Sequence, residues 1–172
     1  MPNLDPDLLL AHLEYAAWAA KKTIAMVDKL PAEAVTAPVE SSFPSILATL
    51  QHLYQGDKYD RIHLQGGSVG MGEITPPATY AELRQEWPRL HAELLTWAKG
   101  NLAARKDVML SGWAIPRPAW MVVMQIANHA THHLGQVVTL ARQAGYRPER
   151  SDFTDLIGYY LQRYPQQQAG AI

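Results

Sequence analysis

The sequence predicts an all-α fold, and two observations support this. Apolar residues recur at spacings of three and four along almost the whole chain, and proline, glycine and helix-capping residues stand at the breaks between these stretches. A length of 172 residues suits one domain. We therefore expect a single helical bundle over residues 1–165, with a frayed tail at 166–172. Four long helices and one short C-terminal helix predict a four-helix bundle with an added helix.

The first two helices are predicted from their caps and their apolar stripes. Asp5 can cap a helix that has Pro6 at its first position and an apolar stripe reaching Leu30 and the proline that follows it. After a proline-containing loop, Ser42 or Ser45 can begin the second helix. That helix continues to the glycine-rich segment that follows it.

The segment 65–78 separates the second helix from the third. Its glycines and prolines exclude a helix, and its length would allow it to cross the end of a bundle. The third helix begins with a capping box, Thr79 followed three residues later by Glu82, and ends near Gly100. Pro88 lies inside this helix, and we expect a kink there because proline removes a backbone donor.

The last third of the sequence predicts two more helices. A mixed connector over residues 105–118 leads into a long fourth helix at 119–144, which ends before Gly145. A short fifth helix, capped by Ser151, extends to about Tyr164.

Composition excludes several classes of function. The chain has no cysteine, so disulfides, thiolate metal sites and a cysteine nucleophile are excluded, and a metal would need nitrogen or oxygen ligands. A net charge of -1 gives no attraction for nucleic acid. The N-terminus has no secretory pattern, and no apolar run approaches the roughly 20 residues that span a bilayer. We expect a cytoplasmic protein that binds neither nucleic acid nor membrane.

Two histidines of the fourth helix interrupt its apolar stripe. At 100° per residue, His129 and His133 fall in one sector with apolar residues, namely Val122, Ile126, Val137 and Leu140. His132 falls on a polar face. Histidines four residues apart on one helix can reach the same metal ion. The alternative is a pair of hydrogen-bonded core histidines. Ala130 follows His129, so the catalytic glutamate of HExxH metalloproteases is missing.

A third ligand would have to come from another helix. His52 lies on a face of the second helix built partly of small residues, which would let a neighbouring helix or a ligand come close. His63 lies more than two turns further along, so it could not easily reach the same ion. We therefore rank His52 above His63, while His12 and His91 stand alone in their helices.

These motifs together resemble a known family. The segments that carry the resemblance are Tyr15-Ala16-Ala17-Trp18, Ser45-Ile46-Leu47-Ala48-Thr49-Leu50-Gln51-His52-Leu53, Asn128-His129-Ala130-Thr131-His132-His133-Leu134-Gly135-Gln136, Ala141-Arg142-Gln143-Ala144-Gly145 and Asp155-Leu156. With these the chain resembles the DinB family, of the DinB/YfiT-like metalloenzyme superfamily. The resemblance covers almost the whole chain.

The resemblance implies a fold and a metal site. The fold is an up-down-down-up four-helix bundle, often a homodimer, and the segment 65–78 would supply its long crossover. The site is a divalent metal held by three histidines from the second and fourth helices, which correspond to His52, His129 and His133. Many relatives have Arg where this chain has Leu134, so a role attached to that Arg is not transferred.

Three neutral imidazoles would leave a coordination position for water or substrate, as in catalytic zinc sites. Zinc is our first choice, nickel the next, and iron or copper would also suit imidazole ligands. Some relatives use the metal to activate a low-molecular-weight thiol, which this cysteine-free chain would take as a cosubstrate. We thus expect a metal-dependent enzyme acting on a small molecule, such as a thiol S-transferase-like detoxification enzyme or a hydrolase.

The alternative is a non-catalytic, metal-binding, dimeric stress-response protein. Other polar residues are candidates for orienting the ligands or contacting substrate under the enzyme hypothesis: Asp57, Tyr59, Asp60, His63, Asn128, His132 and Gln136.

Overall fold

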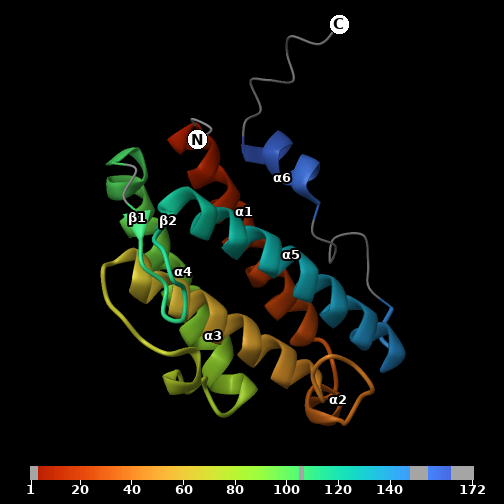
Figure 1. The fold of residues 1–172 in the computed structure, drawn as a ribbon. Coiled ribbons are helices and arrows are strands. Elements are labelled where there is room, and N and C mark those ends of the chain that lie inside the picture. Colours follow the sequence, from red (N-terminus) through yellow and green to blue (C-terminus); the bar gives the residue numbers. More distant parts are fainter. Residues whose placement is uncertain (1–3, 105–106, 148–154, 164–172) are drawn as a thin grey trace, which may run out of the picture.

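The computed structural model describes residues 4–104, 107–147 and 155–163. It is mostly helical, with four main helices packed together and a short helix near the C-terminus, as predicted (Figure 1). The main helices are α1 (Pro6–Val27), α3 (Ile46–Leu64), α4 (Tyr80–Asn101) and α5 (Ala119–Gln143), and the short one is α6 (Leu156–Arg163). The smaller elements are α2 (Ala32–Thr36), two 3₁₀ turns, η1 (Met71–Glu73) and η2 (Leu102–Ala104), and two short strands, β1 (Asp107–Val108) and β2 (Arg117–Pro118).

The predicted helix caps are present. The Asp5 side chain accepts a hydrogen bond from the backbone at the start of α1. Of the two candidate serines, Ser45 caps α3, because its Oγ accepts the Ala48 N–H at 3.0 Å. Thr79 and Glu82 form the reciprocal capping box of α4, with N–H to side-chain oxygen distances of 3.1 and 3.2 Å. These contacts satisfy backbone donors that helix N-termini otherwise leave free.

Several details differ from the prediction. α1 ends at Val27 rather than near Leu30, because the next residues tighten into a turn ahead of Pro31, which disfavours the helical conformation at the residue before it. The predicted loop contains the short helix α2, and the connector after α4 contains η2 and the β1–β2 hairpin. α4 is continuous through the exposed Pro88, in agreement with the predicted extent of this helix. The predicted Ser151 cap and the frayed tail lie outside the described residues.

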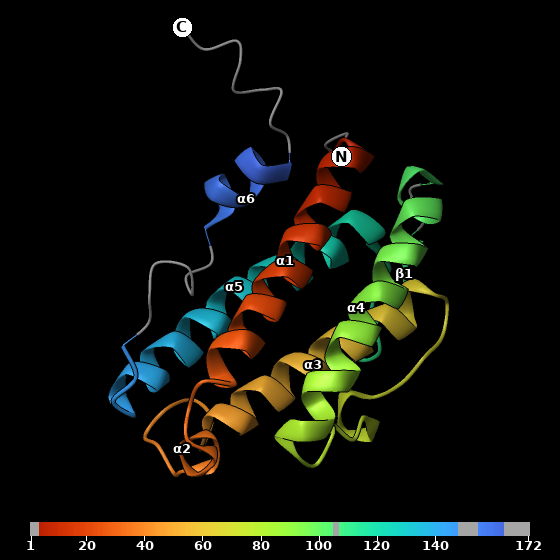
Figure 2. The ribbon, with the colours of Figure 1, turned by 180° about the vertical axis from the view of Figure 1, so that it is seen from behind.

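The order of the helices in space places α3 beside α5. α3 and α4 run in the same direction, opposite to α1 and α5, and the segment between α3 and α4 returns along the outside of the bundle (Figures 1 and 2). α1 and α3 both pack against α5 and α4. The interior is filled by apolar side chains, among them Met26, Leu50, Leu53, Leu83, Trp87, Val123 and Val137. This order corresponds to the up-down-down-up bundle that the resemblance implies.

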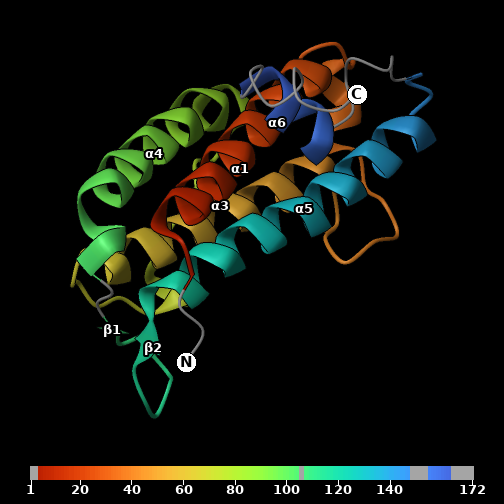
Figure 3. The same ribbon diagram turned by 90° about the horizontal axis from the view of Figure 1, so that it is seen from above.

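The hairpin lies at the end of the bundle where α5 begins (Figure 3). Two residues of α3 bind it through Ser111: the Tyr59 hydroxyl donates to the Ser111 carbonyl at 2.8 Å, and His63 Nε2 lies 2.9 Å from the Ser111 hydroxyl. The hairpin is therefore attached to the same helix that carries His52. No helix in the described parts of the chain is long and apolar enough to cross a membrane.

Candidate metal centre

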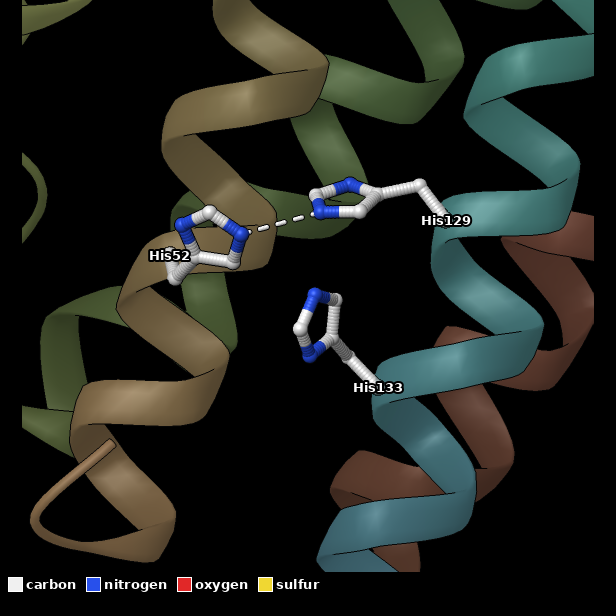
Figure 4. A group of neighbouring side chains, drawn as sticks. All are labelled: His52, His129 and His133. Carbon is white, nitrogen blue, oxygen red and sulfur yellow. Dashed lines mark hydrogen bonds between the residues drawn. The ribbon is translucent and has the colours of Figure 1, made fainter. Parts of the chain in front are cut away.

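Three histidines from two helices converge between α3 and α5. His52 comes from α3, and His129 and His133 come from successive turns of α5 (Figure 4). One ring nitrogen from each lies within 4.8 Å of the others. The closest pair is His52 Nε2 and His129 Nε2, which are 2.9 Å apart. The three histidines predicted from sequence are thus the three that the fold brings together.

The rings of this cluster are held by neighbouring side chains. Phe43 stacks on His52, with ring centroids 4.4 Å apart and planes inclined by 26°, and meets the His133 ring at its edge. Gln136 Oε1 lies 2.7 Å from His133 Nδ1, so this nitrogen donates the bond and Nε2 keeps its lone pair. Gln136 was among the predicted orienting residues. Phe43 was missed, although an aromatic residue just before the predicted Ser45 cap was the available signal.

Gly56 allows the His129 ring to lie close to the backbone of α3. A Cβ on Gly56, one turn after His52, would lie 3.0 Å from His129 Cε1 and 3.2 Å from Nδ1. Real side chains rarely tolerate such contacts, so a larger residue would displace the imidazole. The predicted face of small residues on α3 therefore serves the close approach of the His129 ring.

Burial and repulsion from neighbouring histidines lower the pKa values of His52 and His129. Burial, followed by the neighbouring His133 and His52, lowers the pKa of His129 to about 4. Burial and His133 also lower the pKa of His52. Both imidazoles are therefore uncharged at neutral pH. A neutral imidazole has the free lone pair that a metal ion requires.

The donor atoms of His52, His129 and His133 suit a divalent metal ion. Three imidazole nitrogens converge from two packed helices, which is a ligand set that zinc, nickel, copper and ferrous iron accept. The ligand type does not distinguish among these metals. With three protein ligands, a further coordination position would remain for water or a substrate atom.

Two other candidate residues, Asp57 and His63, form their hydrogen bonds outside the cluster. Asp57 is buried against α4, where Oδ2 accepts bonds from Trp87 Nε1 at 2.7 Å and from His91 Nε2 at 2.8 Å. His91, which stands alone in its helix, is thus paired with Asp57. His63 joins α3 to the hairpin, as described above, and lies outside the three-histidine group.

Two polar residues of α5 are exposed. His132 lies on the outer face of α5, with its Nε2 3.4 Å from Gln136 Nε2. Asn128 is also exposed and forms no side-chain hydrogen bond with the described residues. Leu134 is 2% exposed and belongs to the apolar core. The position therefore presents no charge to the site.

A cleft of about 520 Å³ adjoins the cluster, and His52 and His129 form part of its wall. The other lining residues come from α3, η1, the hairpin segment and α5: Gly56, Tyr59, Asp60, Met71, Leu110, Trp113, Arg117, Met121, Val122 and Gln125. Tyr59 and Asp60, two predicted candidates, thus face the same space as the cluster. A small molecule in this cleft would lie next to two of the three histidines.

Comparison with known proteins decides the family. A model of the DinB family matches residues 5–160. The chain belongs to the DinB family. Among curated proteins, this DinB-family chain is 24% identical over 166 residues to Protein DinB of Bacillus subtilis (strain 168), an alignment that covers 90% of this chain and 94% of that protein. The match to the family model spans both helices that carry the three histidines.

Proposed function

We propose that this DinB-family protein is a divalent-metal-dependent enzyme that acts on a small molecule bound in the cleft beside His52, His129 and His133. One observation carries the proposal: three imidazoles converge, and two of them line a cleft large enough for a small substrate. A purely structural metal site is normally closed by four protein ligands, whereas this group has three.

The reaction class that we propose is transfer of a thiol to an electrophile. The thiol proton passes to solvent, the sulfur forms a bond to the electrophilic carbon, and the leaving group departs with the electron pair of its bond. A bound divalent metal would lower the pKa of a thiol, as it does for water. Because the chain contains no cysteine, the thiol is a cosubstrate of low molecular weight. Zinc is the metal that we propose first.

Metal analysis tests the site. The His129→Ala variant should lose the stoichiometric metal of protein purified without an affinity tag, because a helical pair reduced to one histidine leaves only two donors. His132→Ala is the matched control, since His132 lies on the same helix but is exposed. Elemental analysis with circular dichroism checks metal content and folding. Full metal occupancy in folded His129→Ala protein would remove the site assignment.

An activity assay tests the reaction class. Cysteine, glutathione and coenzyme A, each supplied with 1-chloro-2,4-dinitrobenzene, would report thioether formation by absorbance. We expect a rate that is lost on chelation and restored by zinc. Metal-loaded protein that accelerates none of these pairs would contradict thiol transfer to this electrophile and favour the non-catalytic alternative or hydrolysis.

The homodimer is part of the same proposal. Only the resemblance to the family, in which homodimers are frequent, supports it, and light scattering coupled to size-exclusion chromatography would measure it. A monomer with intact metal binding would overturn the dimer and leave the site proposal standing.

A further inference from the structure

Asp60 occupies the cleft wall at a distance from the three histidines. His52, Gly56 and Asp60 follow one another at intervals of four residues on α3, and all three line the cleft. Eight residues of α-helix span about 12 Å along the axis. The Asp60 carboxyl therefore lies further along the cleft than the three histidines. A molecule with one end at the histidines would have its other end near Asp60.

The Asp60 carboxyl has no partner among the described residues. It forms no hydrogen bond and no ion pair there. Burial, and to a smaller extent the nearby Asp57 carboxyl, together raise the pKa of the Asp60 carboxyl to about 8. No cationic side chain of the described residues offsets these two effects. A partly buried acid in this state is stabilised when a cation or a hydrogen-bond donor is brought to it.

One cationic side chain, that of Arg117, also lines the cleft, and it packs on an aromatic ring rather than on Asp60. Arg117 lies over the Trp113 ring, with its guanidinium carbon 4.7 Å from the ring centroid. Met121 and Val122 of α5 line the cleft about as far along from His129 as Asp60 lies from His52, and Gly56 and Gln125 line the stretch in between. The cleft therefore has nitrogen donors for a metal in one region and, further along, apolar side chains beside an unpaired acid.

We propose that the cleft selects an elongated small molecule with an apolar body and a primary amine at its far end, and that Asp60 binds this amine. The inference rests on the proposed function, because the near end of the molecule is placed at the three-histidine cluster. Asp60 is then a specificity-determining residue, and it takes no part in the chemistry at the metal.

Alkyl hydroxamates test the inference because their head group binds divalent metals. Isothermal titration calorimetry with zinc-loaded protein compares hexanohydroxamic acid, 6-aminohexanohydroxamic acid and the analogue with a terminal carboxylate. We expect the amine to bind at least about tenfold more tightly than the plain chain, which is the gain typical of a charge-assisted hydrogen bond. Asp60→Asn should remove this preference. The exposed Asp7→Asn carries the same chemical change and should retain it.

The outcomes separate the two proposals. Equal binding of the plain and amine chains, or an amine preference that survives Asp60→Asn, overturns the role of Asp60 while the metal site stands. Tightest binding of the carboxylate chain also overturns it and indicates selection by Arg117. Hexylamine and 1-hexanol, titrated into His129→Ala protein, test Asp60 without the metal. A preference for hexylamine there supports the inference even if the hydroxamates fail to bind, whereas no preference overturns it.

Discussion

Two influences oppose ionisation of Asp60, namely its burial and the neighbouring Asp57, and both raise its pKa. The value of about 8 lies above the ordinary value of 3.8, so the folded protein keeps a proton that the unfolded chain releases between these pH values. The free energy of unfolding should therefore fall as pH rises from about 4 to about 8, and this contribution should level off above that range.

Asp60→Asn isolates this contribution, because asparagine does not titrate. We expect the variant to gain stability relative to the parent protein as pH rises through this window. Urea unfolding at several pH values measures the difference. Parallel pH profiles for the two proteins would show that the Asp60 carboxyl ionises normally in the fold.

Single residues also show how far the sequence could predict the site. The positions of His129 and His133 follow from helical periodicity, since a buried stripe must face a neighbouring helix. The stacking of Phe43 on His52 could not be predicted in this way, because it depends on how the loop before α3 folds back over the cluster. The lack of a partner for Asp60 among the described residues could not be predicted either, because it depends on which side chains the neighbouring helices place around it.

At the scale of elements, a buried carboxylate joins α3 to α4. Asp57 on α3 accepts bonds from Trp87 and His91 of α4, and all three side chains are buried. Asp57→Ala should lower the free energy of unfolding by about 2–4 kcal/mol, because it leaves two buried donors unsatisfied.

Tyr54→Phe is the matched control, since it removes a bond between the same two helices. The Tyr54 hydroxyl donates to the exposed Glu86 at 3.0 Å, where water can replace it. Its loss should cost about 0.5–1.5 kcal/mol. Urea denaturation measures both variants, and equal losses would contradict a special role for the buried carboxylate.

Helices with strong local signals were predictable, and elements fixed by tertiary contacts were not. The caps at Ser45 and Thr79 follow from the sequence because a cap is a contact within four residues. The β1–β2 hairpin has only two residues in each strand, too few for an alternating pattern. The bonds of Ser111 to α3 fasten this segment, and they join residues about fifty positions apart.

At the scale of the whole molecule, the helix order brings together residues from distant parts of the chain. His52 and His129 are separated by 77 positions, and they meet because α3 packs against α5. A metal bound by all three histidines would therefore join the first half of the chain to the second. The unfolded chain does not hold these donors together, so the ion would favour the folded state.

This coupling predicts thermal stabilisation by metal. Zinc at a hundred times its Kd should stabilise the fold by about 2.7 kcal/mol, which for a chain of this size corresponds to a rise in Tm of about 5 to 10 °C. Calorimetric scans with zinc and with chelator measure the shift. His52→Ala should abolish the shift because it removes the only ligand that α3 supplies to the three-histidine group, while His132→Ala should keep it. A shift that persists in His52→Ala would mean that zinc stabilises the protein from another position. The prediction that the metal joins α3 to α5 would then be wrong.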